Sequence, residues 1–231
     1  MILLFPQATT AFNQMIVEMF DNSIGDTFLE KSFGSYDFEH VTKVVVIVLK
    51  NTLVETVLSD FLSKSSEIRN YEIVVLERET SGSICSILMA TPLLNNESVI
   101  ISALDQIVVG QKLNFNDFEG MSDADVIAPT YGSDDPLLCY TLEDEVGNVI
   151  QLFEKKRVSG DAILGMYFIR DFSVFFRNCH ELLIKFRGFQ DRIFYTSDVI
   201  NSFIGQDAKC YFPSIELTYI KVRSSKDMSN I

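Results

Sequence analysis

The sequence predicts an α/β fold in which a mixed, mostly parallel sheet is flanked by helices. Residues 44–49 and 99–103 are almost entirely apolar, which is typical of strands covered on both faces. Between them, residues 51–62 carry an apolar stripe at helical spacing, so strands alternate with helices as they do around parallel sheets. The chain has 231 residues, 47% of them hydrophobic, and is therefore long enough to bury one large core.

The first hundred residues contain most of this alternation. Residues 2–5 form a short apolar strand, and Thr9 or Thr10 can cap a helix that runs to about Phe20. Residues 21–37 are mixed in character and rich in turn-forming residues, so we expect no regular element there. Further elements are expected at residues 44–49 (strand), 52–62 (helix capped by Asn51), 72–76 (strand), 82–90 (helix stopped by Pro92) and 99–103 (strand).

After about residue 120 the predicted elements become shorter. Residues 145–148 supply the turn of a hairpin, with Gly147 at its tip. Strands are expected at residues 124–129, 137–142, 149–153, 163–169, 208–212 and 216–222, with helices at 172–186 after Asp171 and up to 204 after Thr196 or Ser197. We expect one domain over residues 1–223 and a flexible polar tail over residues 224–231.

The charge balance limits the classes of ligand. The chain carries 19 Lys and Arg against 32 Asp and Glu, which gives a formal net charge of −13. Such a surface repels nucleic acids and anionic membranes, because binding to polyphosphate backbones requires Lys and Arg. We therefore expect no nucleic-acid partner. A small phosphorylated ligand is still compatible with the sequence where a metal ion or a few local cations neutralise it.

The cysteine pattern and the first residues indicate a cytoplasmic protein. The cysteines lie far apart and have no metal-binding spacing, so we expect reduced core residues rather than a zinc site. Residues 1–5 are apolar but lack a basic region and end at Pro6, which predicts a first strand rather than a signal peptide. No apolar run reaches the length of a membrane span. The cysteines are Cys85, Cys139, Cys179 and Cys210.

An acidic residue follows the apolar strand at residues 99–103. After Leu104 come Asp105 and Gln106. In parallel sheets, ligands bind beyond the carboxyl ends of the strands, where a carboxylate can hold a divalent cation and, through it, a phosphate. The same Asp105 could instead open an ordinary turn. From the residues alone, both interpretations stay open.

Several short segments stand in a defined order around Asp105. Residues 74–83 place a strand before a helix start that contains Gly82, and the free N–H groups of such a start can bind a phosphate or a base carbonyl. After Asp105 and Gln106 come residues 148–156, which end in Glu154, Lys155 and Lys156. Later members of the series are Ser159, Ala162, Gly165, Met166, Tyr167, Phe168, residues 194–197, Asn201 and residues 225–228.

In this order, the segments resemble the sugar-phosphate nucleotidyltransferases, also called NDP-sugar pyrophosphorylases. The resemblance covers about residues 72–228 and implies a Rossmann-like sheet of the glycosyltransferase-A type. By this resemblance, Asp105 would hold Mg²⁺ and Lys155 would contact the sugar phosphate, so these two are the candidate catalytic residues. The resemblance further implies nucleotide-binding roles for Pro6, Gln7, Ala8, Thr80, Gly82 and Ser83, and sugar-binding roles for Glu154, Gly165 and Tyr167.

Each of these residues also has a plainer interpretation. Glu154 could simply pair with a neighbouring lysine, and Lys155 could be a solvated surface charge. Gly165 could serve close packing alone. Tyr167 could belong to the core rather than to a ligand wall. Such a site would nevertheless suit nucleotidyl transfer, which requires charge neutralisation and positioning more than covalent chemistry by the protein.

The resemblance breaks down near the N-terminus. Active members of the family have a glycine-rich loop with an arginine after the first strand, followed by a Pro-Lys-Pro stretch. Here the first strand leads directly into Pro6, Gln7 and Ala8, which match only the start of that loop, and no basic residue precedes Lys31. Lost glycines remove the close backbone approach, and lost cations leave a triphosphate facing an acidic protein. We therefore doubt full pyrophosphorylase activity.

Two functions follow as hypotheses. The first is an enzyme of sugar-nucleotide or surface-polysaccharide precursor metabolism that transfers a nucleotidyl group from a nucleoside triphosphate to a phosphorylated sugar or small alcohol. The second is a pseudoenzyme that binds a sugar nucleotide or a protein partner without chemistry. A glycosyltransferase is disfavoured, because Asp123 and Asp125, which form an Asp-x-Asp motif, come too late in the chain. A homodimer stays open, since no feature locates an interface.

Overall fold

The computed structural model describes residues 1–231 except 95–96, 115–122, 189–190, 207 and 231. The chain divides into two compact units. Unit 1 comprises residues 1–80, 102–120 and 217–231, and unit 2 comprises residues 81–101 and 121–216. Seven strands form a mixed, mostly parallel sheet that is flanked by helices, which confirms the predicted α/β fold. No helix in the described part of the chain is long and apolar enough to cross a membrane.

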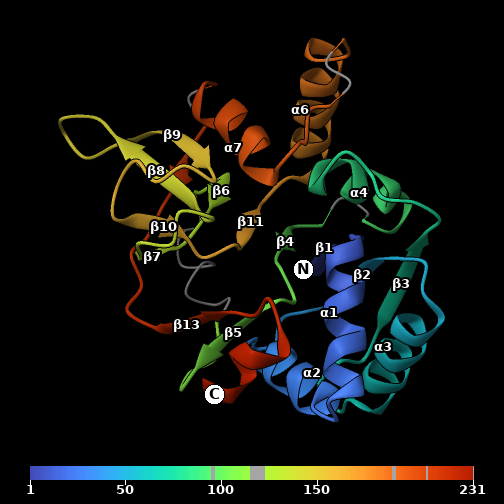
Figure 1. Ribbon diagram of the computed structural model, residues 1–231. Coiled ribbons are helices and arrows are strands. Elements are labelled where there is room, and N and C mark those ends of the chain that lie inside the picture. The colour runs from blue at the N-terminus through green and yellow to red at the C-terminus, as the bar shows by residue number, and fades with distance from the viewer. Residues whose placement is uncertain (95–96, 115–122, 189–190, 207, 231) are drawn as a thin grey trace. The chain divides into compact units, whose positions relative to one another are not determined.

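Unit 1 contains three parallel strands in the order β1-β2-β3. β1 and β2 are buried over most of their length because their sequences are apolar at almost every position, whereas in β3 only Leu76 is buried. Figure 1 shows the strands with their helices in blue to teal. The elements are β1 (Ile2–Gln7), α1 (Thr10–Asp21), α2 (Gly25–Gly34), β2 (Lys43–Leu49), α3 (Thr52–Lys64) and β3 (Tyr71–Leu76).

Two of the helices begin at caps that the sequence predicted. The side chain of Thr9 accepts a hydrogen bond from the backbone N–H of Phe12 at the start of α1. The side chain of Asn51 accepts hydrogen bonds from Leu53 and Val54 at the start of α3. Short polar side chains satisfy backbone donors that no helical turn can reach, so both residues fix where their helix starts.

The prediction for residues 21–37 was wrong, because α2 occupies Gly25–Gly34. Glycines stand at both ends of this helix, and no side chain caps its start, so local signals for a helix are weak. The helix forms because Phe28, Leu29 and Phe33 are buried in the core. Tertiary packing thus overrides the turn-rich composition of the segment.

The described residues of unit 1 form three further elements. The strands β5 (Gln106–Val109) and β13 (Thr218–Lys221) pair antiparallel in a two-stranded sheet. The segment expected to be a flexible tail contains a 3-10 helix, Ser225–Asn230, whose first residue donates hydrogen bonds to the carboxylate of Glu18. Residue 231 of the expected tail lies outside the described residues.

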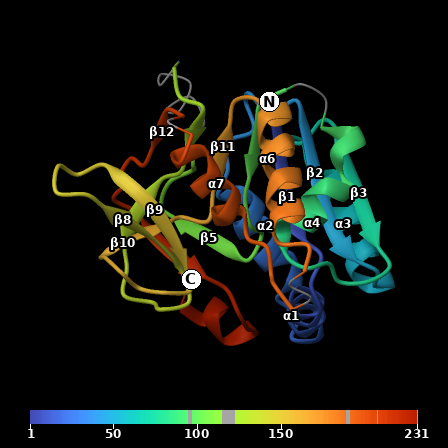
Figure 2. The same cartoon turned by 90° about the horizontal axis from the view of Figure 1, so that it is seen from above.

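Unit 2 contains four strands paired in the order β12-β6-β11-β4 and a second sheet in the order β7-β10-β8-β9. Figure 2 shows β8, β9 and β10 side by side. The elements are α4 (Ser83–Met89), a 3-10 helix (Thr91–Leu93), β4 (Val99–Ile101), β6 (Val126–Ile127), β7 (Thr130–Gly132), β8 (Cys139–Glu143), β9 (Val149–Glu154), β10 (Asp161–Ile163), β11 (Tyr167–Ile169), α6 (Phe172–Lys185), α7 (Thr196–Ile204) and β12 (Cys210–Tyr211).

The single strand predicted at residues 163–169 is instead two strands in different sheets. β10 ends at Ile163, and β11 begins at Tyr167. Gly165, between them, has a φ of +76°, a conformation that glycine adopts without steric cost. Residues on both sides of Gly165 are apolar because both strands are buried. The composition of the segment therefore could not reveal that the chain passes from one strand to another at Gly165.

Candidate functional site

The predicted site residues belong to both units of the chain. Each unit therefore presents its own group of candidate side chains. Unit 1 holds Pro6, Gln7, Ala8, Thr80 and Asp105, and unit 2 holds Gly82, Ser83, Glu154, Lys155, Gly165 and Tyr167.

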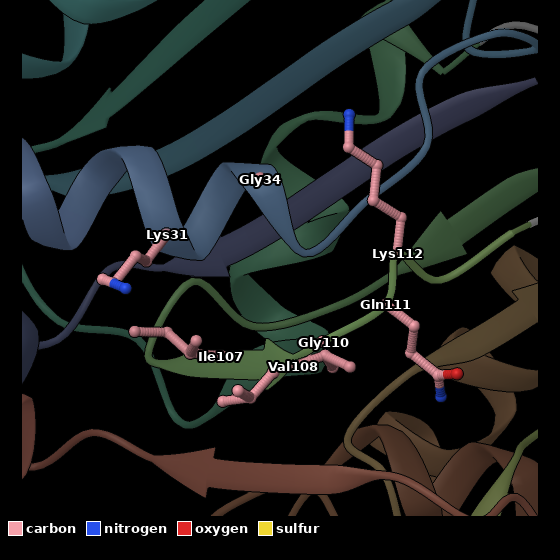
Figure 3. A pocket seen from close by; sticks show the side chains of 8 residues that line it. Lys31, Gly34, Ile107, Val108, Gly110, Gln111 and Lys112 are labelled. Atoms are coloured by element: carbon pink, nitrogen blue, oxygen red, sulfur yellow. The ribbon is translucent and has the colours of Figure 1, made fainter. Parts of the chain in front are cut away.

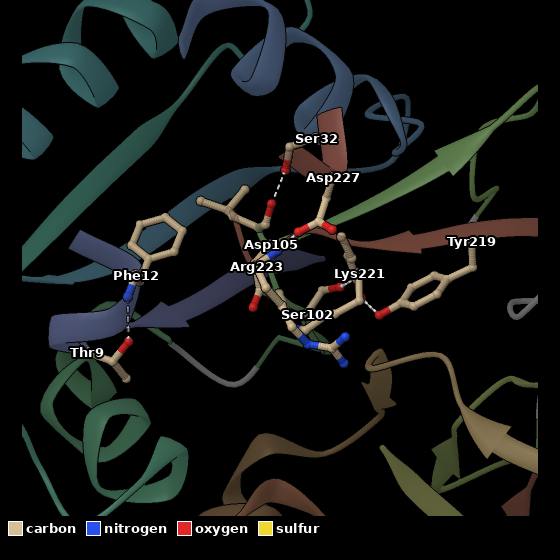
Figure 4. Close-up of polar contacts among 12 residues, drawn as sticks. Thr9, Phe12, Ser32, Ser102, Asp105, Tyr219, Lys221, Arg223 and Asp227 are labelled. Carbon is tan, nitrogen blue, oxygen red and sulfur yellow. Dashed lines mark hydrogen bonds and ion pairs between the residues drawn. The ribbon is translucent and has the colours of Figure 1, made fainter. Parts of the chain in front are cut away.

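In unit 1, the connection between β1 and α1 is very short. β1 ends at Gln7 and α1 begins at Thr10, so Ala8 and Thr9 alone join them. The side chains of Gln7 and Ala8 are buried. The backbone N–H of Thr9 donates a hydrogen bond to the Gln7 carbonyl. The Thr9 hydroxyl accepts one from the backbone N–H of Phe12 (Figure 4). This connection lacks the length and the glycines of a loop that could surround a phosphate chain.

A carboxylate that the sequence did not single out contacts the start of α1. Glu79, which follows β3, accepts hydrogen bonds from the backbone N–H and the hydroxyl of Thr10. These bonds lower the pKa of Glu79 below its usual value, as expected for a carboxylate at the positive end of a helix. Beside it, Lys50 and Glu77 form an ion pair at 2.8 Å. Glu79 was missed because its partner is 69 residues away in the sequence.

Asp105 is paired with a lysine from the far end of unit 1. Its Oδ1 lies 2.6 Å from Nζ of Lys221 on β13, and the two side chains are 27% and 26% exposed. Figure 4 shows both side chains in the same small group. Lys221 could not be identified from the sequence, since it lies 116 residues from Asp105.

A buried polar network holds the segment around Asp105. Nε2 of Gln106 donates to the hydroxyl oxygens of Tyr36 and Ser102, both at 2.7 Å. Tyr36 in turn donates to the carbonyl of Ala103, and Tyr219 donates to Oε1 of Gln106. Burial raises the pKa of Tyr36 to about 12, so this phenol stays a neutral donor. The network fixes the backbone that carries Asp105.

These residues do not fit a magnesium ion. Mg²⁺ prefers several oxygen ligands in octahedral geometry. Asp105 offers a carboxylate that Lys221 already neutralises at 2.6 Å. In the ranges that the structure describes, no three His, Cys, Asp or Glu side chains gather where they could hold a metal. A cation at Asp105 would have to displace the ammonium group of Lys221.

In unit 2, the side chain of Glu154 is half-buried and accepts hydrogen bonds from two neighbouring side chains. Ser197 on α7 donates to Oε2 of Glu154 at 3.0 Å, and the thiol of Cys139 donates to the same carboxylate. Burial raises the pKa of Glu154, while these two donors and the charge of Lys155 oppose the shift. Such a carboxylate, held at the end of β9, can accept hydrogen bonds from the hydroxyl groups of a ligand.

Lys155 adopts an unusual backbone conformation directly after Glu154. Its φ is +52°, which costs a residue other than glycine roughly 1 kcal/mol or more. Its N–H donates to the carbonyl of Leu138, and its Nζ lies 5.1 Å from the ring centroid of Tyr195. The side chain is exposed. Lys155 is therefore a cation that can reach an anionic ligand next to the Glu154 carboxylate.

The start of α4 is occupied by the segment before α7. Gly82 has a φ of +106°, and a Cβ placed there would lie 2.3 Å from the carbonyl oxygen of Phe194. The hydroxyl of Ser83 accepts a hydrogen bond from the backbone N–H of Thr196 and contacts the Thr196 hydroxyl at 3.1 Å. Gly82 and Ser83 thus have a packing role, and the nucleotide contact expected of them stays a prediction.

The structure also places the remaining candidates. Gly165 forms the turn between β10 and β11, and the side chain of Tyr167 is buried and contacts Cys139. Thr80 is half-buried after β3, and Pro6 is half-buried within β1. Tyr167 therefore lies in the same cluster as Glu154, while Gly165 and Pro6 shape the backbone.

A separate pocket of about 360 Å³ in unit 1 lies between α2 and β5. Figure 3 shows Lys31 on α2 and Lys112 after β5 on its rim, above the apolar side chains of Ile107 and Val108. Nζ of Lys112 pairs with Glu67 at 3.1 Å. Its lining, which lies wholly within the described ranges, includes none of the predicted site residues.

Solved structures identify the class of fold. The chain is similar to the nucleoside-diphosphate-sugar pyrophosphorylase from Vibrio cholerae RC9, with a TM-score of 0.77, 18% identity and coverage of 100% of this chain and 98% of that one. It is also similar to a putative glucose-1-phosphate thymidylyltransferase from Bacillus anthracis in complex with sucrose, with a TM-score of 0.73, 11% identity and coverage of 99% and 92%.

A third similar structure is a UDP-glucose pyrophosphorylase complexed with UDP-glucose, with a TM-score of 0.68, 13% identity and coverage of 98% and 94%. No family model and no curated protein matches the sequence. The structures thus confirm the predicted fold of the NDP-sugar pyrophosphorylases over the whole chain, at a sequence identity that shows the fold alone.

Proposed function

We propose that this protein is a catalytically inactive relative of the sugar-phosphate nucleotidyltransferases that binds a sugar nucleotide in the cytoplasm. The observation that carries the proposal is the two-residue connection between β1 and α1. It has no glycine and no cation, and the first basic residue of the chain is Lys31. A nucleoside triphosphate carries more negative charge than a sugar nucleotide, so the loss of this loop disfavours the triphosphate most.

The cluster in unit 2 supports binding of the sugar part. Glu154 can accept hydrogen bonds from sugar hydroxyls, and Lys155 stands next to it as a cation for the phosphate. The unfavourable φ of Lys155 supports a functional role, because strained conformations of this kind gather at ligand sites. The UDP-glucose bound to one of the similar structures makes this sugar nucleotide the natural first ligand to test.

Nucleotidyl transfer in surface-polysaccharide precursor metabolism is the second candidate. The retained Glu154 and Lys155 favour it, since the resemblance assigns Glu154 to the sugar pocket and Lys155 to the sugar phosphate. The pairing of Asp105 with Lys221 at 2.6 Å weighs against it. A cation held by Asp105 would have to compete with that ammonium group.

Calorimetric titration of the whole protein separates the two candidates. UDP-glucose and dTDP-glucose are titrated first, followed by ATP, CTP, GTP, UTP and dTTP with and without Mg²⁺. We expect a sugar nucleotide to bind and Lys155→Ala to weaken its binding by about tenfold, because it removes a charge-assisted contact. Lys156→Ala is the matched control, since Lys156 is the adjacent lysine and its Nζ stacks on Phe153.

A second assay follows the release of pyrophosphate from each triphosphate in the presence of glucose 1-phosphate. We expect none. Release that Asp105→Ala abolishes would establish the transferase and overturn the proposal. Absence of binding by every sugar nucleotide would overturn it as well.

A further inference from the structure

The carboxyl ends of β1, β2 and β3 form one edge of the sheet in unit 1. The strands are parallel, with Gln7 opposite Val48 and Leu49 opposite Leu76. In sheets of this kind, phosphate ligands bind beyond the carboxyl ends, where helices begin and their backbone N–H groups point outward. Here this edge leads into the start of α1, Lys50 and the loop at residues 77–80.

Two of the features at this edge that attract anions, the start of α1 and the ammonium group of Lys50, each contact a carboxylate of the protein itself. The backbone N–H of Thr10, at the start of the twelve-residue helix α1, donates to Glu79. The ammonium group of Lys50 pairs with Glu77 at 2.8 Å. The two carboxylates are two residues apart in the loop that follows β3. The lowered pKa of Glu79 agrees with a carboxylate that stays ionised in this position.

There is room for a ligand beside these contacts. A groove of about 520 Å³ is lined by Thr10 and Lys50, together with the side chains that follow them on α1 and before α3. A phosphate group that entered this groove would meet the Thr10 amide and Lys50, provided that their two carboxylates moved away. The groove combines space, a cation and a helix start at its Thr10 and Lys50 end, while the carboxylates of Glu18 and Asp21 line it further along α1.

We propose that Glu79 is a specificity residue that excludes phosphate ligands from the start of α1 by occupying it with the protein's own carboxylate. The inference rests on the proposed function, because a protein that binds without nucleotidyl transfer needs no triphosphate contact at this helix. Glu77 acts in the same way on Lys50. Glu79 and Glu77 therefore take the places that a bound anion would occupy at the start of α1 and at Lys50.

The test uses inorganic pyrophosphate and tripolyphosphate, which contain no sugar and no base. Glu79→Gln keeps the size of the side chain and removes its charge. Glu72→Gln is the matched control, since Glu72 is an exposed glutamate on β3 and its change alters the net charge equally. We expect wild type and Glu72→Gln to bind pyrophosphate equally weakly, and Glu79→Gln to bind about tenfold more tightly. Glu77→Gln/Glu79→Gln should bind more tightly still.

Equal affinities of Glu79→Gln and Glu72→Gln, in folded proteins with the same circular dichroism, would overturn the inference. A second measurement needs no variant. In the wild type, the amide resonance of Thr10 should follow the ionisation of Glu79 during an acid titration, with a midpoint below the usual glutamate range. A Thr10 resonance that does not move would also overturn it. Because UDP-glucose takes no part in either measurement, failure here is distinguishable from failure of the proposed function.

Discussion

The side-chain amide of Asn201 makes the two hydrogen bonds with Leu152 that a neighbouring strand would otherwise make. Its Oδ1 accepts from the Leu152 N–H at 2.7 Å, and its Nδ2 donates to the Leu152 carbonyl at 3.0 Å. Leu152 lies on β9, one of the two edge strands of the second sheet in unit 2. One turn earlier on α7, Ser197 reaches Glu154, two residues further along β9. One placement of α7 along β9 therefore allows both the Asn201–Leu152 and the Ser197–Glu154 contacts.

Asn201→Ala should destabilise the protein by about 1–3 kcal/mol, because it leaves a backbone donor and an acceptor unpaired in a partly buried place. Urea unfolding measures the change in the free energy of unfolding. Ser202→Ala, on the next residue of α7, is the control, since its hydroxyl makes only a long 3.5 Å contact with the Asp198 carbonyl. Equal effects of the two substitutions would contradict the role given to Asn201.

Gly82→Ala should cost about 2 kcal/mol or more. The new methyl group would collide with the backbone of Phe194, and the φ of +106° is unfavourable for alanine. Gly147→Ala is the matched control, because Gly147 also has a positive φ, +89°, but has open space around it. The difference between the two variants in thermal or urea unfolding isolates the collision. A Gly82→Ala protein as stable as Gly147→Ala would show that Phe194 moves aside freely.

Tyr36→Phe should destabilise unit 1 by about 1–3 kcal/mol, since the hydroxyl belongs to a fully buried network and its loss leaves Gln106 under-bonded. Tyr219→Phe removes a longer contact of 3.3 Å with the same glutamine and should cost less. The two free energies of unfolding, measured side by side, check this order. A larger loss of stability for Tyr219→Phe than for Tyr36→Phe would mean that the hydrogen bond from Tyr219 on β13 holds Gln106 more strongly than the bond to Tyr36 does.

Stability should depend on the ionisation of Glu154. Burial raises its pKa in the folded state, so the folded protein holds this proton more tightly than the unfolded chain does. The contribution of Glu154 to stability therefore falls as the pH rises from the usual glutamate range through the raised pKa. Glu154→Gln removes this ionisation, so we expect it to gain stability relative to the wild type over that window and to keep the gain at neutral pH.

Urea midpoints measured from about pH 4 to about pH 8 test this expectation. Glu143→Gln is the control, because Glu143 is an exposed carboxylate on the neighbouring strand β8. A wild-type protein whose midpoint runs parallel to that of Glu154→Gln over the whole range would rule out the raised pKa.

Elements with strong local signals were predictable from the sequence. The caps Thr9, Asn51 and Asp171 marked three helix starts correctly, because a cap acts on residues two or three positions ahead. The apolar strands β1 and β2 were equally clear. The helix α2 was missed because its stability comes from the burial of Phe28 and Leu29, and the break at Gly165 was missed because both sides of it are buried.

The candidate site was predictable only in part, for a related reason. The order of segments identified Glu154, Lys155 and Asp105 as candidates, but the groups that set their chemistry come from distant parts of the chain. Lys221 and Ser197 lie 116 and 43 residues from their carboxylate partners. A hydroxyl or an ammonium group in such a segment has no neighbour in the sequence that indicates its partner.

The contact between Asn201 and Leu152 also bears on self-association. An exposed edge strand invites a second molecule to extend the sheet, and natural proteins commonly prevent this by covering the edge. At Leu152 that place is taken by a side chain of the same molecule. Two copies that joined β9 to β9 would first have to pull Asn201 away from the strand. A homodimer of this protein should therefore be sought on a different surface.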